Sequence, residues 1–526
     1  MKTTTGFATG LRKWGMLTLA LTMTVSVMSA CSGGNSKEGA EKHVLRLGVL
    51  YGGSDQESWT RQQYTDTFEM LNPNVDFEIV SAINWNDQRF ETPGPDGMNK
   101  QPDPYEKIKE MMTGNNPVDV VIIDYSMLRR LYQENLLKQL DPLIQQSKMD
   151  LSDYVPAVID GIKEASDGNI YALTPTFSSS ALFYNKKIFA EAGVEPPTDN
   201  MTWDDVIAKA KLVSKGTGGD RQYGLQISRW GGDGFSDTTV FGSALQLKVW
   251  DDKGEKMLVN NSEWESVWNT VADLYKQKIV PSSEDINQIN EKLMKAAGDS
   301  YYNPTSGDLF VNGKVAMTIG EYYYINELNQ YMNNASKIKD FEPFEWDVVT
   351  PPTHASKPGI GGNVFLGSLM AINQNAQNPD DAWKFIQFSN SKEWAELKSR
   401  STYELVARKE FLKPKDGAGY NINAFATLKP VPPPSADADK VMRDKPNIYE
   451  AQSPGYELFQ QVVKGDKSAK EALQEWETKG NVVLQRLKTN PNGNNAGEGE
   501  GGGGTIDIKP LESVGSAPPA TEEAVE

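Results

Sequence analysis

The stretch from Gly168 to Lys215 constrains what this chain can fold into more than any other part. Apolar and polar residues alternate through its first half, which is typical of extended backbone. Residues 186–192 then have the composition of a short helix. Gly193 supplies the left-handed residue with which helices commonly end. The stretch therefore predicts a strand that leads directly into a short helix.

A second helix is predicted beyond the Pro196–Pro197 pair, which keeps the intervening residues extended. Thr202 can cap the N-terminus of this helix, and Asp205 lies three positions further on, in a variant of the capping box. Five apolar residues then fall on one helical face, which marks that face as buried: Trp203, Val206, Ile207, Ala210 and Val213. Gly216 ends the segment.

The order of strand, small-residue crossing, strand, helix, Pro-Pro turn and Thr-Trp-Asp-Asp helix resembles a known signature. It is similar to the centre of the family 1 extracellular solute-binding proteins, the sugar-binding subunits of ABC importers. Residues 310–320 and 361–388 resemble the same family, and the resemblance covers residues 43–487 in all. An insertion at residues 87–104 and a long segment at 403–456 depart from the family pattern.

The resemblance implies an α/β fold of the type II periplasmic-binding-protein kind, with two lobes joined by hinge crossings. Lobe I would comprise residues 43–173 and 352–404, and lobe II residues 174–351 and 405–490. Crossings near residues 172–179 and 348–352 would bend when the lobes close over a ligand. Independently, a strand, a helix and a second strand within residues 43–82 predict a βαβ unit of a parallel sheet.

The N-terminal residues 1–30 resemble a bacterial lipoprotein signal peptide. Three basic residues precede an apolar run over residues 16–28, which is too short to span a membrane comfortably as a mature helix. Small residues then lead to Cys31, which would be lipidated and become the mature N-terminus, with a flexible linker over residues 31–42. The protein would then be anchored on the extracytoplasmic face of the cell membrane. An ordinary secretory signal with a coincidental cysteine is the alternative.

Composition excludes several other classes of function. The net charge of −18 disfavours nucleic acid and anionic lipid as partners. Only His43 and His354 are present, which disfavours a Ser-His-Asp triad or a histidine metal site. No phosphate loop or dinucleotide fingerprint appears, so we predict no metal, no cofactor and no enzymatic activity. Residues 491–526 are rich in Gly, Pro and Glu, and we predict a disordered tail there.

The resemblance also implies a carbohydrate-binding cleft between the lobes, where the carboxyl ends of strands meet. Sugars pack their C–H faces on aromatic planes and hydrogen-bond to acids, amides and backbone groups. The lobe I candidates are Gly53, Ser54, Trp85, Asp124, Tyr125, Gly361, Gly362 and Asn363; the others are Trp230, Asp233, Glu321 and Tyr322 in lobe II, and Phe177 at a crossing. For Trp85, Tyr125 and Phe177, packing in the core is an equal alternative.

The sequence therefore predicts a monomeric, lipid-anchored protein that captures a sugar, with an oligosaccharide favoured over a monosaccharide, and delivers it to ABC permease subunits. Two alternatives stay open at this point. A ligand-sensing lipoprotein that signals through a membrane kinase would have the same fold and cleft. A glycoside-active enzyme would need only two suitably placed carboxylates among the 71 acidic residues.

Overall fold

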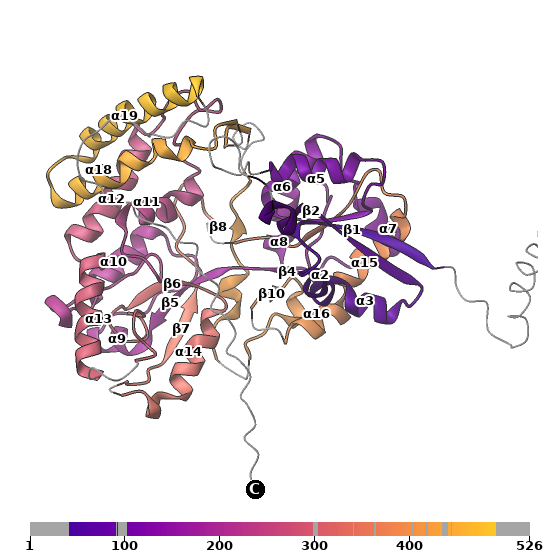
Figure 1. Cartoon of the computed structure of the whole chain (residues 1–526). Helices are drawn as coiled ribbons and strands as arrows, with labels where there is room; N and C mark the ends of the chain where they lie inside the picture. The colour runs from indigo at the N-terminus through magenta and orange to yellow at the C-terminus, as the bar shows by residue number, and fades with distance from the viewer. Residues whose placement is uncertain are drawn as a thin grey trace, which may run out of the picture. The chain divides into compact units, whose positions relative to one another are not determined.

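The computed structural model of the chain describes residues 42–90, 92, 102–297, 303–339, 341–361, 364–400, 403–415, 419–433, 440–442 and 444–490 (Figure 1). The chain divides into two compact units. The larger unit comprises residues up to Leu247 together with Thr270–Ala436, and the smaller one Lys248–Asn269 together with the residues from Asp437 onward. The predictions for the signal peptide, for Cys31 and for the tail lie outside the described residues.

The first sheet of the larger unit has the strand order β2-β1-β3-β9. Its strands are β1 (His43–Gly52), β2 (Val75–Asn84), β3 (Val120–Ile123) and β9 (Leu369–Ile372). β1 runs parallel to β2 and β3, as the predicted βαβ unit requires, and β9 pairs antiparallel with β3. All four residues of β3 are buried, which is typical of central strands covered on both faces.

Helices connect the strands of this sheet (Figure 1). They are α2 (Glu57–Thr60), a π-helical turn (Arg61–Thr65), α3 (Asp66–Leu71), α4 (Trp85–Arg89), α5 (Pro104–Thr113), α6 (Tyr125–Gln133), α7 (Asp141–Ser147), α8 (Pro156–Glu164), α15 (Pro379–Ser389) and α16 (Lys392–Lys398). The fully buried carboxylate of Asp119 accepts backbone N–H groups of Arg46, Gln377 and Asn378 at 3.0, 2.8 and 2.8 Å. It thereby ties the edge of β3 to β1 and to the start of α15.

The second sheet of the larger unit has the order β6-β5-β7. β5 (Ser180–Asn185) lies in the middle and pairs antiparallel with β6 (Met317–Glu321) and β7 (Trp346–Val349). The predicted crossing at residues 348–352 is wrong at its start, because Val348 and Val349 belong to β7. Two β-branched apolar residues before a Pro-Pro pair suit an edge strand that the prolines terminate.

The local chemistry of the central stretch is confirmed around this sheet. Asn185 caps α9 (Lys186–Ala192), and Gly193 ends it in the left-handed conformation with φ of 63°. Thr202 and Asp205 form the reciprocal capping box of α10 (Trp203–Val213), and its five predicted apolar residues are buried. The other helices here are α11 (Gly234–Gly242), α13 (Ser283–Ala297), α14 (Tyr324–Asn333) and α12 (Ser262–Lys276), which passes from the smaller unit into the larger.

Three segments run side by side between the two sheets. β4 (Thr176–Phe177) pairs antiparallel with β10 (Leu405–Val406). Directly after β4, Ser178 and Phe365 exchange two backbone hydrogen bonds of 3.0 and 2.9 Å. The chain therefore passes from the second sheet back to the first near Phe365 rather than at residues 348–352. Two short strands, β8 (Ile360–Gly361) and β11 (Lys429–Pro430), pair parallel with each other.

The smaller unit is built around α18 (Ser453–Lys464), α19 (Ala469–Thr489) and the first part of α12. Its core is aromatic: the rings of Trp268 and Trp476 stack at 5.4 Å, and Phe459 meets Trp268 edge-on at 5.1 Å. Residues 251–254 form a turn, with a 2.9 Å hydrogen bond from Gly254 N to Asp251 O. Within the described ranges, no helix combines the length and apolar character needed to cross a membrane.

Candidate functional site

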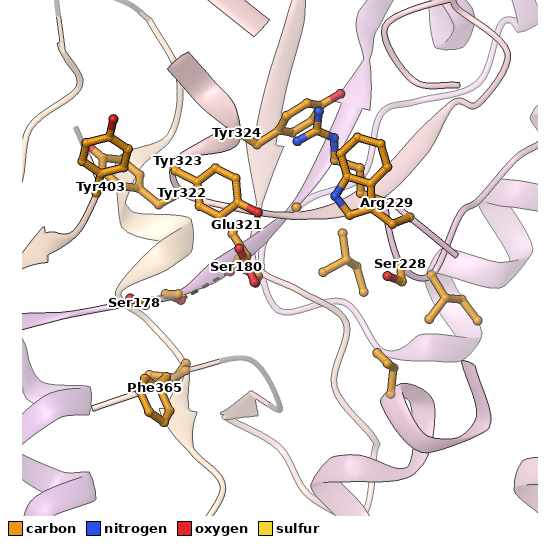
Figure 2. Close-up of a pocket in the computed structure, with 17 residues that line it drawn as sticks. Ser178, Ser180, Ser228, Arg229, Glu321, Tyr322, Tyr323, Tyr324, Phe365 and Tyr403 are labelled. Atoms are coloured by element: carbon orange, nitrogen blue, oxygen red, sulfur yellow. Dashed lines mark hydrogen bonds between the residues drawn. The ribbon is translucent and has the colours of Figure 1, made fainter. Parts of the chain in front are cut away.

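A cavity of about 600 Å³ opens beside the second sheet of the larger unit (Figure 2). Its walls come from the segment before β5, the loop that follows residue 226, the carboxyl end of β6 and the two segments that contain Phe365 and Tyr403. The lining residues are Ser178, Ser179, Ser180, Ile227, Ser228, Arg229, Trp230, Val240, Ile319, Gly320, Glu321, Tyr322, Tyr323, Tyr324, Val364, Phe365 and Tyr403.

Large aromatic side chains are unusually exposed around this cavity. Trp230 is 66% exposed, Tyr403 74%, Phe365 55% and Tyr323 37%. They come from different segments, and Figure 2 shows Tyr403, Phe365 and the Arg229 side on separate sides of the opening. Clusters of exposed aromatic side chains commonly mark binding surfaces, because their apolar faces are left for another molecule to cover.

Trp230 is exposed but rests on a buried base. The guanidinium carbon of Arg229 lies 4.4 Å from the ring centroid of Trp230 and 3.7 Å from that of Tyr324. Arg229 Nε donates to Asp308 at 3.0 Å, and Arg229 also forms an ion pair with Glu327. Burial alone would lower the pKa of Arg229, but the hydrogen bond to Glu327 and the charge of Asp308 outweigh it and raise that pKa. A permanently charged guanidinium therefore holds the indole in place from behind.

The polar part of the cavity wall is formed by hydroxyl groups and one acid. Glu321 ends β6 opposite Ser180 of β5, and its side chain is exposed. Partial burial, and then a hydrogen bond to Glu321, raise the pKa of Tyr323. The Tyr323 hydroxyl therefore stays protonated. Ser178 is exposed and Ser228 partly so, which leaves hydroxyl groups available to a polar ligand.

Three predicted site residues line this cavity: Trp230, Glu321 and Tyr322. They differ in what they offer to a ligand, since Tyr322 is only 6% exposed and packs edge-on against Phe425 at 5.4 Å. The neighbouring ring of Tyr323 is the exposed one. Side chains alternate along the end of β6, and a run of three tyrosines does not reveal in the sequence which one faces outward.

Three other predicted residues come together at the ends of β1 and β2, outside this cavity. The rings of Tyr51 and Trp85 stack at 5.0 Å with an interplanar angle of 14°. Gly53 lies close to the end of β2, because a Cβ there would lie 3.0 Å from Asn86 Nδ2 and 3.2 Å from Asn84 Oδ1. Ser54 accepts a hydrogen bond from the Asn86 amide at 3.4 Å. These three residues therefore lie at neighbouring strand ends, and their contact with a ligand stays a prediction.

The two predicted aspartates act as helix caps and do not line the cavity. Asp124 accepts the backbone N–H groups of Ser126 and Met127 at the start of α6. Asp233 accepts the N–H of Phe235 at 3.1 Å and the hydroxyl of Ser236 at 2.6 Å at the start of α11. Aspartate is a preferred N-cap residue, so position after a strand is not by itself a sign of ligand contact.

The remaining predicted residues are buried or lie outside the described part of the chain. Tyr125 is 6% exposed and donates its hydroxyl to Gly161 O at 2.7 Å, and Phe177 is 2% exposed. Gly361 lies in β8, buried against Leu428. None of these three lines the cavity. Gly362 and Asn363 lie outside the described residues.

Sequence reasoning missed the serines before β5, Ser228, Arg229, Tyr323, Phe365 and Tyr403. Arg229 and Tyr323 sit next to predicted residues, so the loops themselves were found. Phe365 and Tyr403 lie in crossing segments, to which no strand-end argument applies. Among the described residues, no cluster of three or more His, Cys, Asp or Glu side chains could hold a metal ion.

Asp237 on α11 gives a pH-dependent prediction. Burial raises its pKa to about 7 from the ordinary value of 3.8, although the Tyr275 hydroxyl donates to it at 2.6 Å. Between these two values the folded state keeps a proton that the unfolded state loses. The free energy of unfolding should therefore fall as pH rises from 3.8 to about 7, by at most ~1.4 kcal/mol per pH unit. In Asp237→Asn, this decrease in the free energy of unfolding should be absent when urea unfolding is measured across the same pH range.

The exposed Asp204 supplies a control for this pH series. Asp204→Asn on the surface of α10 should leave the pH dependence of unfolding as it is in the native protein. If the free energies of unfolding of Asp237→Asn and of the native protein differ by the same amount at every pH, the buried carboxyl does not titrate in this range.

The profile of the bacterial extracellular solute-binding proteins matches residues 53–396 of the chain. This match covers more than half of the sequence, and the chain therefore belongs to that family. The fold agrees: within the larger unit, the segments that contain β4, Phe365 and β10 run between two sheets, and an open cavity lies beside the second sheet. The family consists of binding proteins that serve transport rather than of enzymes.

Particular relatives are distant. A Brucella abortus (strain 2308) protein named as a binding protein is 22% identical over 435 residues, 80% of this chain and 88% of that protein. The sn-glycerol-3-phosphate-binding periplasmic protein of Pectobacterium atrosepticum is 24% identical over 357 residues, 64% of this chain and 72% of that protein. The structure of the sugar-binding protein MalE from Xanthomonas citri matches with a TM-score of 0.54 and 16% identity, covering 85% and 98% of the two chains. At that identity the structural match establishes the fold alone.

Proposed function

We propose that this protein captures a carbohydrate in the cavity beside the second sheet and delivers it to an ABC importer. The observation that carries this proposal is the set of exposed aromatic rings around a cavity of about 600 Å³. This volume lies within the ~300–1,000 Å³ typical of small-molecule sites. Aromatic faces suit the C–H faces of sugar rings, and the serines and Glu321 suit their hydroxyl groups.

An oligosaccharide fits this wall better than a single sugar. Trp230, Phe365 and Tyr403 belong to three separate segments, and Figure 2 shows the rings of Phe365 and Tyr403 on different sides of the cavity. One sugar ring can cover only one or two such faces at a time. Several linked rings would use them all, and each would add a stacking contact.

Binding without hydrolysis is also favoured by the acids of the wall. Glycoside hydrolysis generally needs two carboxyl groups that flank the scissile bond. Among the described residues that line the cavity, Glu321 is the one carboxylic acid. Asp308 behind the wall is 2% exposed and is engaged by Arg229 and Tyr324. A pair of free carboxyl groups facing one ligand is therefore missing from the described wall.

Calorimetric titration with a panel of plant and microbial oligosaccharides tests the proposal. We expect at least one of them to bind with one site per chain. A ligand that binds only the folded state stabilises it by roughly 2.7 kcal/mol at a hundredfold excess over the dissociation constant, so melting should shift upward as well. A panel without any binder, together with tight binding of an amino acid or peptide, would refute the carbohydrate assignment.

We further propose that Cys31 is lipidated and anchors the protein on the extracytoplasmic face of the membrane. The small residues before this single cysteine and the polar linker after it support the proposal. Cys31→Ala should move the protein from the detergent phase to the aqueous phase in a partitioning assay, while its melting temperature stays the same. Unchanged partitioning of the variant would exclude the anchor.

A further inference from the structure

We propose that the cavity accepts uncharged or amino-bearing sugars and rejects ligands that carry phosphate or carboxylate groups. This inference rests on the proposed function, since it names the class of sugar for the same cavity. It follows from how the charges at the wall are arranged: the guanidinium of Arg229 is paired with Asp308 and Glu327, and Glu321 is the one carboxylic acid among the described lining residues.

The one cation of the described wall is already neutralised. Arg229 lies 3.0 Å from Asp308 and is paired with Glu327 as well. Glu321 has no such cation beside it in the wall, and its side chain is exposed to the cavity. Among the described lining residues, Glu321 is therefore the one charged group without an ion pair.

The guanidinium is also out of reach of a ligand. Arg229 is 6% exposed, and the rings of Trp230 and Tyr324 cover its two faces at 4.4 and 3.7 Å. Its Nη1 atom is buried and lacks a hydrogen-bond partner in the described structure. A phosphate would have to displace the Trp230 ring to pair with this group.

The residues that precede Val364 and Tyr403 in the sequence, Gly362, Asn363, Ser401 and Thr402, carry no charge. An anionic ligand group placed near Glu321 would therefore meet repulsion, which is stronger in a partly desolvated cavity than in bulk water. An ammonium group at the same place would pair with Glu321.

This arrangement separates the chain from one of its relatives. The Pectobacterium atrosepticum relative is named for binding sn-glycerol 3-phosphate, a phosphate ester. A phosphate dianion needs accessible cations or a set of free N–H donors. The described wall of this cavity offers one covered guanidinium only, so the ligand class of that relative does not transfer to this chain.

Collisional quenching of Trp230 fluorescence measures the local charge without any knowledge of the ligand. The Trp230 signal is obtained as the difference between the native protein and Trp230→Phe. Trp59 is 62% exposed and lies outside the cavity, so Trp59→Phe gives a matched control for the charge of the whole chain. Caesium, iodide and the neutral quencher acrylamide are compared at equal ionic strength.

The quenching constant of each ion is divided by that of acrylamide at the same residue. We expect the resulting ratio of caesium to iodide quenching to be about twofold or more higher at Trp230 than at Trp59. In Glu321→Gln this preference should shrink, because the unpaired carboxylate is gone. Equal quenching by the two ions at Trp230, or stronger quenching by iodide, would overturn the inference.

The second test is direct titration of the protein with neutral and charged ligands. An oligosaccharide that binds is compared with its uronic acid and glucosamine analogues, and sn-glycerol 3-phosphate is titrated alongside. We expect the uronic acid analogue to bind at least tenfold more weakly than the neutral sugar and the phosphate ester to give no heat. Tighter binding of either anion would refute the inference. If no carbohydrate binds, the proposed function fails, whereas the quenching result still decides the charge of the wall.

Discussion

Trp230→Ala should lower the affinity for the bound sugar about tenfold or more while leaving the melting temperature unchanged. An aromatic contact contributes ~0.5–1.5 kcal/mol beyond its buried area, and ~1.4 kcal/mol corresponds to a factor of ten in affinity. Because the indole is 66% exposed, its removal leaves no void in the core. Calorimetric titration and thermal melting of the same variant measure the two quantities separately.

Trp59→Ala is the control for this experiment, because Trp59 is exposed to a similar degree and lies outside the cavity. Its affinity for the sugar should equal that of the native protein. An unchanged affinity of Trp230→Ala would place the sugar elsewhere on the chain. A sharply lowered melting temperature would instead mean that Trp230 packs as part of the core.

Asp308→Ala should lower the free energy of unfolding by about 3–5 kcal/mol, as expected when one partner of a buried ion pair is removed. Asp308 is 2% exposed, accepts Arg229 Nε at 3.0 Å and accepts the Tyr324 hydroxyl at 2.8 Å. Without it, the buried guanidinium loses its enclosed partner, and the base under Trp230 loosens. Urea unfolding of the purified protein measures the loss.

Glu327→Ala provides the comparison, because the Glu327 side chain is 37% exposed and water can replace it. Its removal should cost only about 0–1 kcal/mol, as for exposed ion pairs. Equal losses for the two variants would mean that Arg229 is stabilised mainly from the solvent side. The guanidinium would then not be the fixed base that we describe.

Local chemistry allowed much of the second sheet and its helices to be predicted. The Thr202–Asp205 capping box and the left-handed Gly193 act within a few residues, so the sequence alone determines them. Segments whose role depends on distant partners were less predictable. Residues 223–227, for example, do not form a continuous strand, because Tyr223 and Gln226 make only isolated bridges to Val315 and Thr318.

The candidate site was predictable where it follows strand ends and not where it follows the crossings. Glu321 lies at the carboxyl end of β6 and Trp230 in the loop that follows residue 226, and both line the cavity. Phe365 and Tyr403 reach it only because the crossing segments run beside β4 and the residues that follow it. That arrangement depends on pairing between residues nearly two hundred positions or more apart, which no local pattern records.

A crystal structure of the protein with a bound oligosaccharide tests the central claim most directly. The sugar would be chosen from the titration panel as the tightest binder. We predict a sugar ring stacked on the exposed face of Trp230, with a hydroxyl group donating to Glu321 and further rings against Phe365 or Tyr403. A saturated protein whose cavity beside the second sheet holds no sugar would contradict the account.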